Sequence, residues 1–119
     1  MLERPIRLEH THRILFTREA FHARNHAVRD LVTLNKPHKL PRVLVFVDEA
    51  VATANRDLID DIVAYGEVHA AAFTLADTPI TLPGGEACKN DLRLVECCWD
   101  AINEAAFDRH SYVFVIGGG

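Results

Sequence analysis

The chain has few cysteines, no long hydrophobic run and no cluster of positive charge, and each absence excludes a class of protein. The three cysteines form no C-x-x-C pair and two of them are adjacent, which argues for a reducing compartment and against a disulfide framework or a zinc cage. The longest apolar runs, residues 43–47 and 112–116, are far below the ~20 residues of a membrane helix. The first residues also contain no signal-peptide hydrophobic region. We therefore predict a cytoplasmic protein that does not enter a membrane.

Basic residues are too scattered for a nucleic-acid-binding face. The net charge is −4, whereas nonspecific binding to a phosphate backbone needs a basic patch. With 49% hydrophobic and 25% charged residues, the 119-residue chain has the composition of one globular domain. We divide it into an N-terminal strand and loop extension, residues 1–41, and a main unit, residues 42–119.

The N-terminal extension begins with an alternating pattern. Over residues 6–17, the four apolar residues at 6, 8, 14 and 16 share one face of an extended chain with His10 and His12, and charged residues and threonines fall on the other face, with Leu15 breaking the pattern. This alternation predicts a long strand with one wet face, or two shorter strands, near the edge of a sheet. A short helix capped by Asn25 is expected next, followed by a loop over residues 35–41, where two prolines exclude regular structure.

The main unit alternates between strands and helices. The continuous apolar run 43–47 predicts a strand buried on both faces, and residues 69–75 and 112–116 predict two more. Thr53 is expected to cap the first intervening helix, and Gly66 to end it. Asn90 or Asp91 is expected to begin the second. One stripe of that second helix is predicted to be core, and its members are Val95, Cys98, Trp99, Ile102 and Ala106.

This order predicts an α/β fold with a Rossmann-like βαβαβ parallel sheet and an N-terminal strand or hairpin region. Ligands of such sheets bind beyond the carboxyl ends of the strands. Asp48, the loop 84–89 and the glycines 117–119 follow a strand or precede the next helix at that edge. We therefore expect these three elements to converge.

Each of the three elements has a plain and a functional interpretation. Gly117, Gly118 and Gly119 are either a flexible end or a cradle in which backbone N–H groups approach an anion. Glu86 and Lys89 are either an incidental ion pair or ligands of ribose and phosphate oxygens. Asp48 either begins a turn or accepts from ribose hydroxyls. The motif G-x-G-x-x-G is absent.

Four segments resemble the N-terminal nucleotide-binding domain of 3-dehydroquinate synthase, and more broadly the sugar phosphate cyclases. They are Val43-Leu-Val-Phe-Val-Asp-Glu49, Pro83-Gly-Gly-Glu-Ala-Cys-Lys-Asn90, Asp108-Arg-His-Ser111 and Val115-Ile-Gly-Gly-Gly119. Their order and spacing agree with the family across residues 42–119, and the P-G-G-E-x-x-K motif paired with a later strand ending in three glycines is specific.

The resemblance implies that NAD is the cofactor. Asp48 would meet the adenosine ribose, Glu86 and Lys89 would contact the cofactor's ribose and neighbouring groups, and the glycines 117–119 would pack against the pyrophosphate. One departure is that Ala50 stands where the family often has an asparagine. The family's metal ligands and its residues for substrate and phosphate belong to a helical C-terminal domain that these 119 residues do not include. No catalytic or metal-binding residue is therefore predicted in this chain.

The resemblance further implies that a longer parent protein is a phosphate-eliminating, carbocycle-forming lyase. Its partners would be NAD, a divalent metal (zinc or cobalt) and a phosphorylated sugar, and it would be a homodimer. The 119-residue chain alone is then expected to be inactive, as the truncated cofactor-binding part of that enzyme. Two alternatives stay open, namely the corresponding domain of a metal-dependent polyol or glycerol dehydrogenase and a stand-alone module for nucleotide binding or dimerisation.

Overall fold

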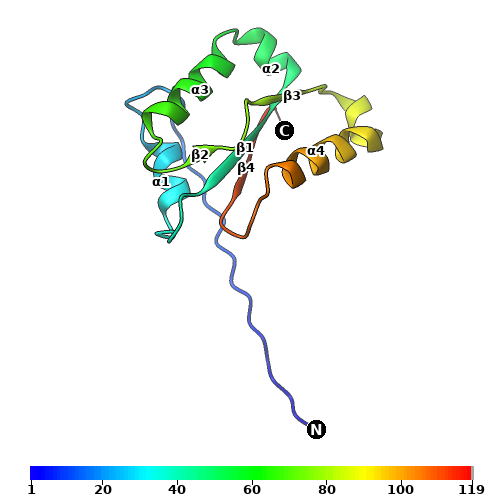
Figure 1. Cartoon of the computed structure of the whole chain (residues 1–119). Coiled ribbons are helices and arrows are strands. Elements are labelled where there is room, and N and C mark those ends of the chain that lie inside the picture. Colours follow the sequence, from blue (N-terminus) through cyan, green and yellow to red (C-terminus); the bar gives the residue numbers. More distant parts are fainter. Residues whose placement is uncertain (119) are drawn as a thin grey trace.

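The computed structural model describes residues 1–118, which form a small open parallel sheet with helices on both faces (Figure 1). The four strands are β1 (Arg42–Asp48), β2 (Thr74–Leu75), β3 (Ile80–Leu82) and β4 (Tyr112–Ile116). The helices are α1 (Ala27–Thr33), α2 (Glu49–Ala54), α3 (Leu58–Val68), the 3₁₀ helix η1 (Glu86–Asn90) and α4 (Leu92–Glu104). The expected α/β class with a parallel sheet is confirmed.

β1 is the central strand, and all three other strands pair with it in parallel. β4 pairs along residues 43–47, while β2 and β3 pair with the two ends of β1. All five residues from Val43 to Val47 are buried. This explains the uninterrupted apolar run, because a strand covered on both faces has no wet side on which polar residues could alternate.

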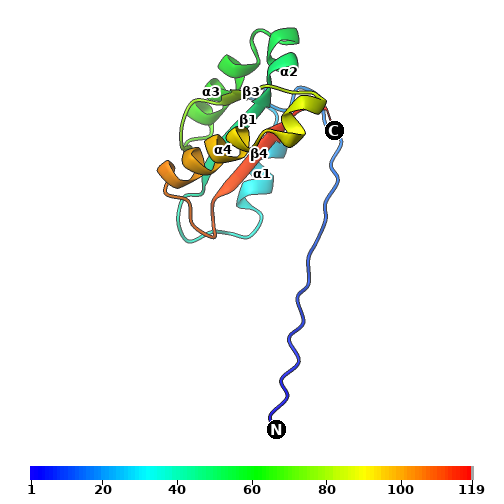
Figure 2. The same ribbon diagram turned by 90° about the vertical axis from the view of Figure 1, so that its right-hand side faces the viewer.

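The main core lies between β1 and the helices α1 and α3. Val43, Val45 and Val47 point into this layer and are completely buried. The side chains that meet them come from α1, from α3 and from the segment before β2, and are Val32, Ile62, Tyr65 and Phe73. Figure 2, turned by 90°, shows α4 in front of the sheet, on the face opposite to this core.

The connection after β1 differs from the prediction. Thr53 was expected as a helix cap but lies inside α2, and Asp48 caps α2 instead. Gly66 was expected to end a helix but lies inside α3, which ends at the cap residue His69. A β-carbon at Gly66 would be 2.8 Å from Cδ1 of Leu75. The glycine therefore serves the close packing of α3 against β2 and does not reverse the chain.

The second half of the sheet is also shorter and more divided than expected. The predicted strand 69–75 is reduced to β2, because residues 69–72 form turns in which Ala72 N donates to His69 O at 2.8 Å. β3 was not predicted, since its three residues stand between Pro79 and Pro83 in what reads as a loop. α4 begins after Asp91, as predicted, with the Asp91 side chain accepting from the N–H of Arg93.

The stripe of α4 that was predicted to be core is largely open to solvent. Trp99 is 64% exposed and Val95 is 41% exposed. The stripe faces the sheet over an open apolar groove and is not enclosed by it. Helical periodicity identified the correct face of α4, but it could not show that the opposing layer is too small to cover that face.

The predicted N-terminal strand or hairpin is wrong. Residues 1–17 contain neither helix nor strand and extend away from the sheet (Figures 1 and 2). Alternation gives a segment the side chains of a strand, but a strand also needs a partner for its backbone N–H and C=O groups. Within residues 1–118 this segment has no such partner.

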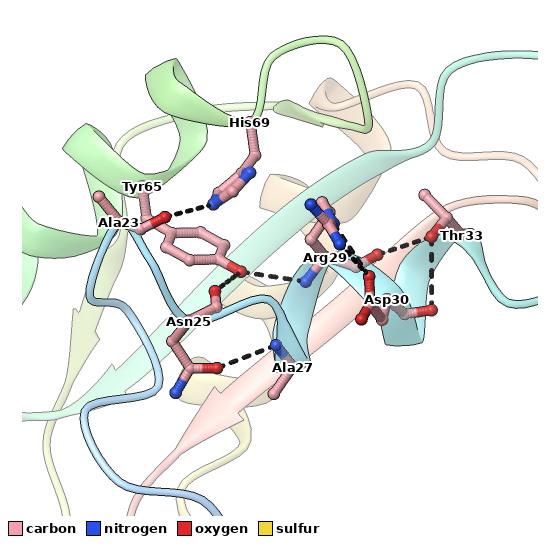
Figure 3. Close-up of polar contacts among 8 residues, drawn as sticks. All are labelled: Ala23, Asn25, Ala27, Arg29, Asp30, Thr33, Tyr65 and His69. Carbon is pink, nitrogen blue, oxygen red and sulfur yellow. Dashed lines mark hydrogen bonds and ion pairs between the residues drawn. The ribbon is translucent and has the colours of Figure 1, made fainter.

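A buried polar network fixes the chain between this N-terminal segment and α1 (Figure 3). The hydroxyl of Tyr65, on α3, donates to the carbonyl of Asn25 at 2.7 Å and accepts from the N–H of Arg29 at 3.2 Å. His69 Nε2 lies 3.1 Å from the carbonyl of Ala23. The predicted cap residue Asn25 precedes the cap position, His26, yet its side chain does accept from the N–H of Ala27 at 2.9 Å.

Candidate functional site

Five of the six predicted cofactor-binding residues line one cavity. Asp48, Glu86, Lys89, Gly117 and Gly118 surround a space of about 310 Å³ at the carboxyl ends of β1, β3 and β4. The sixth, Gly119, lies outside the described residues. The convergence expected from topology is therefore present in the structure.

Strand register explains why these distant segments meet. Asp48 is paired with Leu82 on one side, and Val47 is paired with Ile116 on the other. The residues that follow Leu82 and Ile116, Pro83 and Gly117, consequently flank Asp48 at the same edge of the sheet. Parallel pairing thus places the proline–glycine loop and the final glycines on either side of one carboxylate.

The two oxygens of the Asp48 carboxylate have different surroundings. Oδ1 accepts from the N–H of Ala50 at 2.7 Å and of Val51 at 3.4 Å, which caps α2. Oδ2 lies directly over Gly84, where a β-carbon would overlap it, and a β-carbon at Gly117 would be 3.3 Å from the Asp48 β-carbon. Among the described residues, no donor reaches Oδ2. One oxygen is therefore structural, and the other remains able to accept from a ligand.

The next residue, Gly85, must also be a glycine, in this case because of its backbone conformation. Gly85 has φ +86° and ψ 179°, a conformation that is essentially restricted to glycine. No atom lies within 4 Å of the position that its β-carbon would take. The Pro83-Gly-Gly85 sequence thus combines a close approach at one glycine with an unusual backbone conformation at the other, immediately before η1.

Glu86 and Lys89 lie on the same side of η1 and form an ion pair. Lys89 Nζ donates to Glu86 Oε1 at 2.8 Å. The side chain of Lys89 is 64% exposed and that of Glu86 is 89% exposed. An exposed pair of this kind adds little stability. Glu86 and Lys89 can therefore separate at little energetic cost and instead bind a ligand that carries hydroxyl groups and negative charge.

At the start of α4, just beyond η1, Asp91 and Arg93 form a hydrogen-bonded ion pair. The pKa of Asp91 lies below its ordinary value, chiefly because the Arg93 side chain donates hydrogen bonds to its carboxylate. The same hydrogen bond raises the pKa of Arg93. As the cap residue of α4, Asp91 also places a negative charge at the N-terminus of that helix, where the helix dipole favours it.

The apolar floor of the cavity was not anticipated from the sequence. Leu82, Pro83 and Val115 contribute to it, together with Phe46. Leu82 could not be identified because β3 was not recognised, and Phe46 and Val115 read as ordinary core residues. An apolar surface beside a few polar groups is typical of a site that binds a small molecule.

A larger cavity lies elsewhere, between α4 and the segment linking β2 to β3. It measures about 610 Å³ and carries the acidic side chains Asp77, Glu96, Asp100 and Glu104 against one arginine, Arg93. Such a charge balance would repel a phosphate-bearing ligand. We therefore favour the cavity at the carboxyl ends of the strands as the ligand site, although it is the smaller of the two.

Among residues 1–118, no group of three or more histidine, cysteine, aspartate or glutamate side chains is arranged to hold a metal ion. The helices of the same region are all too short or too polar to cross a bilayer. Comparisons of the chain with protein-family models, with curated proteins and with solved structures found no match.

Proposed function

We propose that the cavity beside Asp48 binds NAD, and that the chain is the cofactor-binding part of an enzyme resembling 3-dehydroquinate synthase. The observation that carries this proposal is that Asp48, the Pro83–Lys89 loop and Gly117–Gly118 line one cavity although they are far apart in the sequence. Three of the four segments on which the resemblance rests contribute to this cavity, and the fourth, Asp108–Ser111, does not.

The residues fit a dinucleotide in chemistry and in shape. Oδ2 of Asp48 can accept from a ribose hydroxyl, Lys89 can donate to phosphate or hydroxyl oxygens, and Glu86 can accept from a second hydroxyl. The backbone N–H groups of Gly117 and Gly118 can approach a pyrophosphate closely, because a β-carbon is absent. A cavity of about 310 Å³ lies at the lower end of the range for small-molecule sites, roughly 300–1,000 Å³, and suits part of a dinucleotide.

Within this proposal the chain positions the cofactor and performs no bond-breaking step. Bound NAD would supply reversible hydride acceptance from a substrate alcohol. Asp48 would fix the ribose through an acceptor that the α2 cap holds in place, and Glu86 with Lys89 would open their ion pair to orient the cofactor. A divalent metal, zinc or cobalt, and a phosphorylated sugar would be bound by residues other than those described here.

Binding by residues 1–118 alone should be weak. Where a dinucleotide fold holds its pyrophosphate tightly, the N-terminus of a helix directly follows the glycine loop. In the part of the chain that the structure describes, no helix follows Gly117 and Gly118. We therefore expect a Kd of roughly 1 mM, a binding free energy of about −4 kcal/mol.

The test is a titration of the isotopically labelled chain with NAD, followed by amide chemical shifts. Shifts should be confined to Asp48, residues 84–89 and the two described glycines. ADP should reproduce those nearest Asp48, since the adenosine ribose is assigned there. Shifts elsewhere, or none at millimolar NAD, would count against the site, whereas micromolar affinity would contradict the role assigned to a following helix.

A further inference from the structure

Another cavity lies at the amino ends of β1 and β4, and its lining is basic. It measures about 410 Å³ and is formed by the loop before β1 and the turn before β4. The polar residues that line it are Asn35, Lys36, His38, Arg109, His110 and Tyr112. None of these is acidic, although the chain as a whole has a net charge of −4. The positive charge is therefore a local property of this cavity and not a general property of the protein.

Strand register brings the two sides of this cavity together. Val43 of β1 pairs with Tyr112 of β4, so the residues that precede each strand leave the sheet side by side. Lys39 Nζ donates to Asp108 Oδ2 at 2.9 Å and joins the two segments. Both lie at the end of the sheet away from the C-terminus (Figures 1 and 2). The described chain therefore supplies both walls of the cavity, on the side opposite to the glycines 117–118.

The carboxylate of Asp108, next to Arg109 in the chain, is fully engaged in holding the turn. Oδ1 accepts from the N–H of His110 at 2.8 Å and from the hydroxyl of Ser111 at 3.3 Å. Oδ2 accepts from Lys39, which also balances its negative charge. Asp108 thus fixes the shape of the turn without neutralising the cations that line the cavity.

Arg109 is oriented by the next residue and keeps most of its donors. Its Nε donates to His110 Nε2 at 3.1 Å. Within residues 1–118, its two terminal amino groups make no hydrogen bond, and neither Arg109 nor Lys36 forms an ion pair. A guanidinium held in this way presents paired N–H groups that match two oxygens of a phosphate. Because His110 Nε2 accepts, the proton of the neutral ring is on Nδ1, which is a further donor.

Lys36 has a backbone conformation that is uncommon for a residue with a long side chain. Its φ is +46°, in the left-handed region, and its N–H donates to the carbonyl of Thr33 at 2.9 Å, just after α1. Glycine would take this conformation with less strain. A strained residue is a reason to look for a function of its side chain, and the side chain of Lys36 brings an ammonium group to the same cavity as Arg109.

We propose that this cavity binds the phosphoryl group of a small phosphorylated molecule. Lys36 and Arg109 balance its charge, and His110 and Tyr112 donate hydrogen bonds to its remaining oxygens. The volume of about 410 Å³ is within the range of roughly 300–1,000 Å³ for small-molecule sites. It leaves room for the organic part of the ligand beside Pro37 and the ring of Tyr112.

This ligand is distinct from a substrate that would exchange hydride with NAD beside Asp48. Tyr112 and Ile116 are the two ends of β4, and at about 3.3 Å per residue the strand separates the two cavities by roughly 13 Å. Hydride transfer requires the reacting atoms to be in contact. The site therefore serves a second ligand, and it gives a role to residues 108–111, the segment of the resemblance that the cavity beside Asp48 does not use.

The test is a titration of the isotopically labelled full chain with inorganic phosphate and with glycerol 3-phosphate, followed by amide chemical shifts. Constant ionic strength keeps the general screening of charges unchanged. Arg109→Gln removes the guanidinium, and Arg56→Gln makes the same change at an exposed arginine between α2 and α3. Lys36→Gly removes the ammonium group and also relieves the backbone strain.

We expect both ligands to shift the amides of residues 38–39 and 109–112. Arg109→Gln and Lys36→Gly should weaken binding about tenfold or more, because each removes a charged donor, whereas Arg56→Gln should bind as wild type. Lys36→Gly should be at least as stable to urea as wild type, which separates lost binding from lost folding. Circular dichroism verifies that Arg109→Gln retains the fold.

Four results would overturn the proposal. They are no shift at millimolar concentrations of either ligand, shifts confined to residues 84–89 and 117–118, unchanged binding in both cavity variants, and equal weakening in Arg56→Gln. A short single-stranded oligonucleotide that binds more tightly than glycerol 3-phosphate would identify a nucleic-acid site and would overturn it as well. The outcome does not depend on NAD, because the two cavities are followed through different amides.

Discussion

Gly84 lies against the carboxylate of Asp48 so closely that any β-carbon at position 84 would occupy the space of Oδ2. The first glycine of the Pro83–Lys89 loop thus fixes the position of an acidic side chain on another strand. Alanine at position 84 should force Asp48 or the loop to move, at a cost of about 1–3 kcal/mol in unfolding free energy, as for other overpacked sites. Urea denaturation measures this loss. Gly118→Ala is the control, because a β-carbon there meets nothing within 4 Å, and an equal loss in both variants would contradict the packing explanation.

The two oxygens of Asp48 can be separated by two substitutions. Asp48→Ala removes the cap of α2 and should lower stability by about 0.5–2 kcal/mol. Asp48→Asn keeps an oxygen for the cap and should be nearly as stable as wild type, but it places an amide donor where Oδ2 can accept. NAD-induced shifts should therefore disappear in Asp48→Asn although its unfolding curve does not change. Retained NAD shifts in this variant would exclude Oδ2 as the ribose acceptor.

The hydroxyl of Tyr65 joins α3 to the root of the N-terminal segment. Tyr65→Phe leaves the carbonyl of Asn25 and the N–H of Arg29 without this partner, and Tyr65 itself is only 1% exposed. An unsatisfied buried polar group costs about 1–3 kcal/mol, so we expect a loss of that size on urea denaturation. Tyr112→Phe is the matched control, since no hydrogen bond of the Tyr112 hydroxyl exists among the described residues. Equal effects of the two changes would show that the hydroxyl itself is unimportant.

The ion pair between Lys39 and Asp108 should give the protein an acid-sensitive contact between the loop before β1 and the turn before β4. The side-chain hydrogen bond from Lys39 is the main cause that lowers the pKa of Asp108 from 3.8 to about 2. Because the folded-state pKa is depressed, this contribution to stability is present above the unfolded-state pKa and is lost as the pH falls through about 2. Carboxyl carbon NMR should find this low pKa in wild type and a value nearer 3.8 in Lys39→Met. An unchanged pKa in that variant would show that backbone donors, and not Lys39, set it.

The sequence predicted those features that one segment determines by itself. The run from Val43 to Val47 needed no information from elsewhere to be recognised as a buried strand, and Asp91 caps α4 where local chemistry predicts a cap. The cavity was also predictable, because parallel topology alone brings strand ends to one edge.

The predictions that failed concern features that depend on contacts with other segments of the chain. Residues 6–17 have a strand's side chains but no partner strand within the described chain, and Trp99 lies on the correct face of α4 over a layer too small to cover it. β3 is a strand because β1 lies beside it, although its own three residues are flanked by prolines. Local patterns could not reveal these relationships.

The central place of β1 also has a consequence for the chain during its synthesis. β1 leaves the ribosome early, yet its longest pairing is with β4, and each paired residue of β4 stands 69 positions later in the sequence (Val43 with Tyr112, for example). Until Tyr112–Ile116 have emerged, the most apolar strand of the protein has one edge uncovered along almost its whole length. Pairings of such long sequence separation form slowly and leave strands open to aggregation. The nascent chain is therefore most vulnerable while α4 is being made, and slowing translation in that interval would lengthen the exposure of β1.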